Sequence, residues 1–201
     1  MARLQLNKSS LARETKNLGT YERFLPSLDL KRQQLTAERA KAAQALVQSH
    51  REIETFNTQV GQKLRMLANS DVDLTDLVKL SNVALGTENL VGTHLPVLER
   101  IEVDVRPYAL LAKPHWVDNV AAMLHDMLEL HIRVQVEERR VALLDGAVKT
   151  ITQRVNLFDK VLIPRTRGNI KKIRIYLSDE EMAAVVRSKI AKRKRAEELT
   201  T

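Results

Sequence analysis

The stretch from Val117 to Arg165 reads VDNVAAMLHDMLELHIRVQVEERRVALLDGAVKTITQRVNLFDKVLIPR. Every seventh residue from Val120 to Leu162 is apolar, and a companion series three residues further on is apolar at every position except Glu137. The two series are Val120, Met127, Val134, Val141, Val148, Val155, Leu162 and Met123, Leu130, Glu137, Leu144, Ile151, Phe158. Apolar residues at alternating spacings of three and four keep one stripe facing a partner helix. The pattern predicts a long helix, continuing to Pro164, that packs against a second long helix.

A second stretch with the same spacing occupies residues 4–67. Its seven-residue series runs from Leu4 to Leu67 in a single register and is apolar at all positions except Arg32 and Arg39. Pro26 interrupts the pattern, because an internal proline removes a backbone hydrogen bond and clashes with the preceding turn. We expect a helix from about 9 to 68, with a kink or break near Pro26 and an N-cap at Ser9 or Ser10.

Residues 69–116 are rich in turn-forming residues and lack this spacing. Leu74, Leu77, Val78 and Leu80 favour a short helix, whereas the run Val97–Val105 alternates in a way that is typical of a strand in a small β-hairpin. Beyond Pro164, apolar residues resume helical spacing in a shifted phase, and Ser178–Asp179 suggest a local stop.

These patterns predict an all-α fold, a long two-helix antiparallel coiled coil with a compact central insert that holds a short helix and a small β-hairpin. The expected organisation is one elongated domain, 1–201, divided into an N-terminal helix (1–68), the insert (69–116), a C-terminal helix (117–195) and a tail (196–201). If Leu67 lies near Val120, the numbers of paired residues sum to about 187, which brings Pro26 within one turn of Pro164.

The composition excludes several classes of protein. There are no cysteines, so disulfides and thiolate metal sites are excluded, and aromatic residues make up only 3% of the chain. No run of about 18 apolar residues is present, and the N-terminus has no apolar signal core, so we expect a soluble, intracellular protein.

Charge is distributed unevenly along the chain. The net charge is +8, with +5 in residues 1–41, −4 in 42–159 and +9 in 160–195. The basic runs Arg165–Arg174 and Arg187–Arg195 are compatible with a solvated or protein-facing surface, with nucleic acid or with an anionic membrane. No aromatic residues interleave with Lys192–Arg195, so base stacking has no support. A basic coiled-coil nucleic-acid-binding or scaffold protein remains the alternative on these grounds.

Candidate catalytic and metal sites are weak. His125 and Glu129 lie one helical turn apart, but His131 lies off that face, and we interpret the three as solvated polar residues. The segment Gly86–Gly92 has two glycines but not the lysine of a phosphate-binding loop. We therefore expect no catalytic residues, no cofactor and no metal.

Several segments resemble the D subunit of the V-type and archaeal-type rotary ATPases. The most specific is Gln153–Arg165, QRVNLFDKVLIPR, followed by Asn169–Ile173, which is similar to the family's C-terminal signature. Leu6–Leu11, Leu28–Leu35 and Leu95–Glu99 resemble three further family segments, so that the resemblance covers essentially the whole chain. Two departures are Arg23–Pro26, where the family has a small basic run, and Asn7, where it has proline.

The resemblance implies a non-catalytic central rotor shaft. It implies that the terminal end of the coiled coil inserts into a hexamer of A and B subunits, which carry the nucleotides. It also implies contacts with the small F subunit of the stalk and with the C subunit above the membrane ring, on the cytoplasmic face, with no nucleic acid bound. The family-signature residues expected to face partners are Lys31, Arg32, Arg154, Asn156, Ile163, Pro164 and Arg165. The expected basic tip towards the hexamer consists of Lys171, Lys172, Arg187, Lys189, Lys192 and Arg193.

Overall fold

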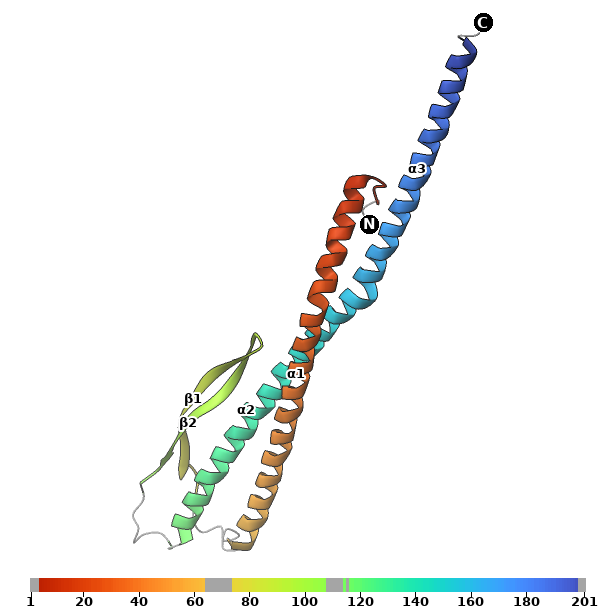
Figure 1. The fold of residues 1–201 in the computed structure, drawn as a ribbon. Helices are drawn as coiled ribbons and strands as arrows, with labels where there is room; N and C mark the ends of the chain where they lie inside the picture. Colours follow the sequence, from red (N-terminus) through yellow and green to blue (C-terminus); the bar gives the residue numbers. More distant parts are fainter. Residues whose placement is uncertain (1–3, 64–73, 108–113, 115, 199–201) are drawn as a thin grey trace. The chain divides into compact units, whose positions relative to one another are not determined.

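Long helices and one β-hairpin make up the computed structural model, which describes residues 4–63, 74–107, 114 and 116–198. The elements in order are helix α1 (Lys8–Lys63), strands β1 (Val78–Leu90) and β2 (Thr93–Val105), helix α2 (Trp116–Asn156), the π-helix η2 (Leu157–Leu162) and helix α3 (Ile163–Glu198) (Figure 1). The predicted architecture, long helices on either side of a small β insert, is confirmed. The end of the first helix, expected near residue 68, lies outside the described residues. The second long helix begins at Trp116, within one residue of the expected start at 117.

Helix α1 begins at Lys8, which agrees with the expected start at about residue 9, but its cap is different. The Asn7 side chain accepts a hydrogen bond at Oδ1 from the backbone N–H of Ser10, 2.7 Å away, so Asn7 is the N-cap and the prediction of Ser9 or Ser10 is wrong. The helix continues through Pro26 without a break. We call the apolar contact between the paired helices the seam. An exposed proline costs a helix one hydrogen bond, but the seam on both sides of Pro26 holds the helix together.

The hairpin in the insert pairs β1 and β2 in antiparallel register. Its two-residue loop, Val91–Gly92, has positive φ angles of 52° and 83°, as type I′ turns require. The N–H of Gly92 is held by Asn89 Oδ1 at 2.9 Å. Two register shifts, at Ser81 in β1 and at Glu99 in β2, interrupt the alternation of side chains. The Glu99 carboxylate lies over Gly86, where a Cβ would require that side chain to move.

The short helix predicted from Leu74 to Leu80 is wrong. Leu74–Leu77 form a turn, and Val78 and Leu80 belong to β1. Leu77 is buried in a small core with Val117, Val120 and Ala121 of α2. The spacing that resembled a helix arises because Leu77 ends a turn that packs on α2, after which the strand begins.

The chain divides into two compact units, residues 31–150 and residues 1–30 with 151–201. In the unit 31–150, α1 and α2 run antiparallel, as the ion pairs Arg39–Asp145 (2.6 Å) and His50–Glu138 (3.7 Å) demonstrate. Both pairs fall within a few residues of the predicted register. The seam between them buries Leu35 and Leu144, each about 1% exposed.

In the unit formed by 1–30 and 151–201, α1 is antiparallel to the helix that continues from Ile151. The pairs Glu22–Arg167 (2.7 Å) and Lys8–Glu181 (3.7 Å) fix this pairing, and Tyr21 meets the Phe158 ring edge-on at 5.4 Å. The Glu22–Arg167 pair joins residues four before Pro26 and three after Pro164, which agrees with the predicted proximity of the two prolines.

The π-helix η2 explains the shift of phase that the sequence shows beyond Pro164. The backbone N–H of Ile163 bonds to the carbonyl of Phe158, five residues back, so the helix accommodates one extra residue. The seam therefore passes from Val155 to Ile163 in a step of eight, and Ile163 is buried while Leu162, the predicted seam residue, is only half-buried. Pro164 has no N–H to donate, and the wider turn just before it relieves the clash of its ring.

No helix of the described residues is long and apolar enough to cross a membrane. Helix α3 also passes through Ser178–Asp179 without interruption, so the predicted local stop there is wrong.

Candidate partner-binding surfaces

The C-terminal part of α3 exposes an apolar stripe. Met182, Val185, Val186 and Ile190 lie on one side of the helix at spacings of three and four, and each is between 52% and 59% exposed. Earlier in the same helix, Ile170 and Ile173 are buried. No part of the described chain covers the stripe, because the Lys8–Glu181 ion pair marks the level at which α1 begins.

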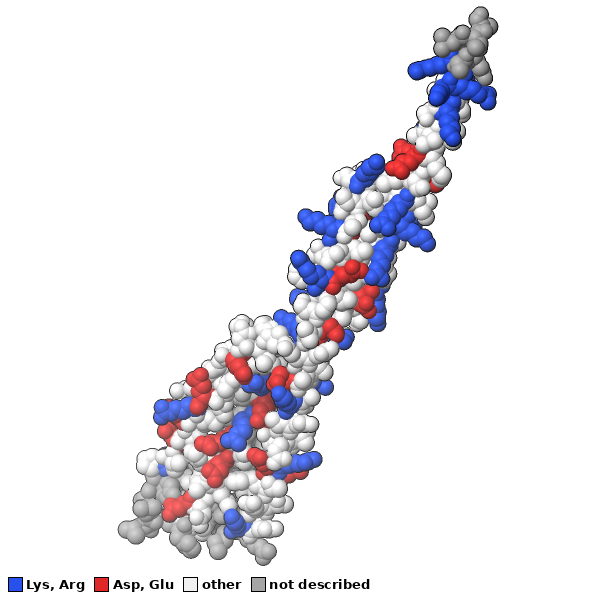
Figure 2. Space-filling view, in the orientation of Figure 1, with Lys and Arg blue, Asp and Glu red and all other residues white. Residues whose placement is uncertain are grey.

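The predicted basic residues lie along the same helix, two of them before the stripe and four beside or beyond it. All of them are exposed on α3: Lys171, Lys172, Arg187, Lys189, Lys192 and Arg193. Figure 2 shows Lys and Arg side chains predominating over α3, whereas acidic and basic side chains mix over the unit 31–150. A helix that combines an uncovered apolar stripe with dense positive charge is suited to a partner with an apolar surface and acidic residues around it.

The C-terminal signature residues cluster around η2. Arg154 and Asn156 end α2, and Pro164 and Arg165 begin α3, all four with exposed side chains. Ile163 is 6% exposed and belongs to the seam of this chain, so it offers no surface to a partner. The signature therefore encodes a local backbone feature, the π-helix before Pro164, together with exposed polar groups on either side of it.

One N-terminal signature residue, Lys31, lies beside the hairpin loop. The Lys31 ammonium is 3.4 Å from the position that a Cβ on Gly92 would occupy, which brings α1 to the tip of the hairpin. Lys31 and Arg32 are both half-buried. Lys31 precedes the C-terminal signature by about 120 residues in the sequence. It belongs to the unit 31–150, whereas the C-terminal signature belongs to the unit formed by 1–30 and 151–201.

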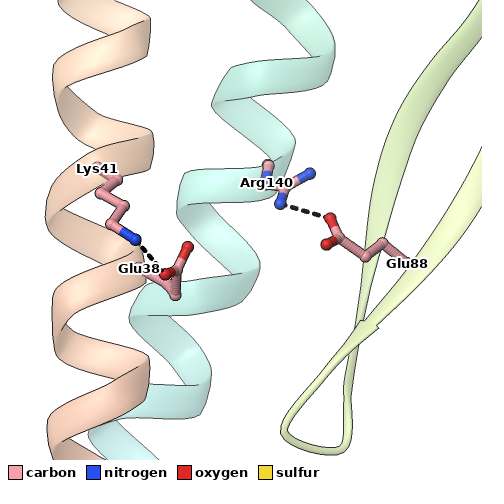
Figure 3. Close-up of polar contacts among 4 residues, drawn as sticks. All are labelled: Glu38, Lys41, Glu88 and Arg140. Atoms are coloured by element: carbon pink, nitrogen blue, oxygen red, sulfur yellow. Dashed lines mark hydrogen bonds and ion pairs between the residues drawn. The ribbon is translucent and has the colours of Figure 1, made fainter.

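A groove in the unit 31–150 escaped the sequence analysis. It has a volume of about 350 Å³ and lies between α1, α2 and β2. Two ion pairs border it, Glu38–Lys41 at 2.6 Å within α1 and Glu88–Arg140 at 2.7 Å between the hairpin and α2 (Figure 3). Glu137 also lines the groove, and its buried Oε2 has no hydrogen-bond partner in the part of the chain that the structure describes.

The signal that could have revealed the groove is the polar interruption of the seam. Glu137 is the single charged member of the companion series in α2, and Ser49, which interrupts the matching series in α1, is buried as well. A charged residue at a seam position indicates a place where the seam opens or specifies a partner. The sequence alone does not reveal the third wall, because β2 reaches the groove only through the fold.

The described residues contain no group of three His, Asp or Glu side chains that could hold a metal ion. His125 lies 3.9 Å from Glu129 and 3.6 Å from Asp126, on an accessible face of α2. His131 is exposed elsewhere on the helix. These contacts are those of solvated polar residues.

Comparisons with known proteins agree with the geometry. The family model of the ATP synthase D subunit matches residues 10–193. The chain is 31% identical to a V-type ATP synthase D subunit of Borreliella burgdorferi, over 96% of this chain and 95% of that protein. Proteins of the same name from Chlamydia muridarum and Chlamydia felis are 32% and 30% identical, over 96% of this chain and 96% and 94% of theirs. The chain, with its long helices, its hairpin insert and its uncovered basic end, belongs to the D subunit family of V-type ATP synthases.

Proposed function

We propose that this chain is the non-catalytic central rotor shaft of a V-type ATP synthase. It transmits torque between ATP turnover in a hexamer of A and B subunits and ion translocation through a membrane ring. The observation that carries the proposal is the end of α3, where apolar residues are exposed on a helix that the described chain does not cover. In a protein that works within a larger assembly, such a surface is suited to burial in a partner.

The seam supplies the stiffness that a shaft needs. Large aliphatic side chains such as Leu35, Leu144 and Ile173 are almost fully buried between paired helices. Interiors packed in this way are as dense as molecular crystals and resist deformation. Two interlocked helices therefore resist both bending and twisting better than one helix does.

The basic residues of α3 suit a rotating contact. Their long side chains carry charge on flexible stems and do not require one fixed geometry, unlike a bidentate or stacked site. We propose that this end of α3 lies within the hexamer, against acidic residues of the A and B subunits. The exposed signature residues around η2, together with Lys31, then face the small F subunit and the C subunit, on the cytoplasmic side of the membrane.

A reversible crosslink tests the proposal. Since the chain has no cysteine, a single Val186→Cys variant can form one defined disulfide with a cysteine placed on the inner surface of the hexamer. We expect ATP hydrolysis and ion transport to stop together on oxidation and to return on reduction, and the purified chain alone to hydrolyse no ATP. Turnover that continues in the fully crosslinked complex would contradict a rotating shaft.

A salt titration addresses the nucleic-acid alternative. Electrostatic binding to nucleic acid weakens steeply with salt, because bound counterions are released. We expect no band shift of DNA or RNA by the assembled complex at physiological salt. Low-micromolar, salt-dependent binding by a chain that joins no hexamer would favour the alternative.

A further inference from the structure

The groove in the unit 31–150 points to a specific partner contact. We propose that it is a socket for one lysine or arginine side chain from another protein of the V-type ATP synthase, held by Glu137. The proposal deepens the proposed function by naming the chemistry of one contact. It rests on the chain's place in the complex and does not require that the chain rotate.

The walls of the socket suit the stem of a long cationic side chain. Ala42 and Ala45 of α1 leave room because their side chains are small, and Val136 of α2 and the segment 96–98 of β2 complete an apolar lining. Lysine and arginine bury their methylene stems along such walls while the charged head reaches a polar group. The volume of about 350 Å³ accommodates one such side chain.

Most of the charges that border the socket are already paired. Lys41 contacts Glu38, and in Figure 3 Arg140 extends towards Glu88 on the hairpin. These two pairs neutralise themselves and leave little net field in the groove. The charged groups that remain to be accounted for are Glu137 and Arg133.

Glu137 has a buried oxygen that lacks a donor. Oε2 of Glu137 is shielded from water without a hydrogen bond among the described residues. Taking a carboxylate oxygen out of water in this way is unfavourable unless a donor replaces the lost water. Oε2 is closed to water-sized molecules in this chain alone, so the Glu137 side chain must first turn towards the groove. An ammonium or guanidinium head would then supply a charge-assisted hydrogen bond, whereas an anion would be repelled.

Arg133 is the competing explanation. It lies one helical turn before Glu137, lines the same groove and is exposed. A rotation of its side chain would bring a cation to Glu137 from within the chain. The experiments below therefore separate an internal partner from an external one.

The first experiment compares Glu137→Gln with Glu138→Gln. Glu138 is the neighbouring exposed carboxylate, which pairs with His50, so it is matched in charge and in sequence position. In the isolated chain we expect Glu137→Gln to raise the midpoint of thermal unfolding by about 2–4 °C, because a neutral amide loses less on desolvation. The variant should nevertheless bind about tenfold more weakly to the complex that lacks this chain. Glu138→Gln should change neither quantity appreciably.

Arg133→Ala completes the set. If Glu137 awaits an external cation, this variant should unfold at the same temperature as the unmodified chain and bind the complex at least as tightly. If Glu137→Gln and Arg133→Ala both lower the unfolding temperature, Arg133 is the partner of Glu137. This result would overturn the proposal. Unchanged affinity of Glu137→Gln for the complex would also overturn it.

A photo-crosslinker identifies the occupant. Benzoylphenylalanine placed at position 133, at the mouth of the groove, is activated in the assembled complex, and the products are read by mass spectrometry. We expect capture of a segment of another protein of the complex that contains lysine or arginine. Capture confined to this chain, or of a segment with neither residue, contradicts the socket. Either outcome is independent of whether the Val186→Cys crosslink stops turnover.

Discussion

The two compact units of the chain use similar apolar residues in opposite ways. The unit 31–150 has a formal net charge of −1 and the unit formed by 1–30 and 151–201 has +9, which together make the +8 of the whole chain. In the first, the hairpin and two helices cover most of the seam, whereas in the second the seam ends near Leu177 and the apolar residues beyond it are exposed. The same spacing of apolar residues therefore stabilises the chain itself in one region and remains uncovered in the other.

The largest expected contrast comes from placing a charge on each apolar stripe. Leu144→Asp buries an unpaired carboxylate at a site that is 1% exposed, so we expect a loss of about 3–5 kcal/mol in the free energy of unfolding. Val186→Asp, at a site that is 55% exposed, should leave chemical denaturation unchanged within about 0.5 kcal/mol and impair assembly instead. Equal destabilisation by both would mean that the end of α3 is covered by its own chain.

The second contrast tests the register shift at η2. Deleting Lys149 moves Ile151 and Val155 off the seam, so we expect a loss of at least about 3 kcal/mol. Deleting Lys160, an exposed residue within the π-helix, removes the extra residue and leaves an ordinary α-helix in register. Its stability by urea denaturation should stay within about 1 kcal/mol of the unmodified chain. If the two deletions are equally damaging, the π-helix does not absorb the shift.

The cap of α1 gives a smaller effect. Asn7→Ala removes the acceptor for the N–H of Ser10 and should cost about 1 kcal/mol. Ser9→Ala is the control, and we expect no measurable change from it. Because the cap belongs to the basic unit, hydrogen exchange should rise in the first turns of α1 and not in α2. If Ser9→Ala lowers the free energy of unfolding as much as Asn7→Ala does, Ser9 contributes to the cap and the assignment to Asn7 alone is wrong.

The smallest effect is expected from the exposed ion pairs, one in each unit. A double-mutant cycle on Arg39 and Asp145 should give a coupling of about 0.2–1 kcal/mol, and the cycle on Glu22 and Arg167 a similar value. Both couplings should decrease in about 1 M salt, because exposed charges are screened. A coupling of several kcal/mol in either unit would make charge, and not the seam, the main determinant of register.

The sequence predicted the features that depend on a repeating pattern. The seam of α1 and α2, their antiparallel register and the strand around Val97–Val105 all follow from spacing, which reports on one face of an element. Predictions about single residues were wrong where a local feature, such as a β-bulge or a cap, interrupted the repeating pattern. The register shift at Ser81 hid β1, since it moves the apolar residues from Val78 and Leu80 to Val83 and Leu85.

For the same reason, the sequence predicted the basic surface of α3 but not the groove. The basic residues of α3 are adjacent in sequence, so charge counting was enough to find them. The groove draws its lining from α1, α2 and β2, segments separated by about 40 to 100 residues, and only the fold brings them together. Glu137 was visible as an irregularity of the seam, but nothing in the spacing indicated that one oxygen of its carboxylate would lack a donor among the described residues.

The uncovered end of α3 has a consequence for the life of the chain before assembly. From Glu181 onwards it is a single helix of fewer than twenty residues, and helices of this length without tertiary packing are only marginally stable in water. Such a segment opens often and, with its many lysines and arginines, is an easy substrate for trypsin-like proteases. If the end of α3 is buried in the hexamer as proposed, assembled chains would be shielded there, whereas unassembled chains would be trimmed.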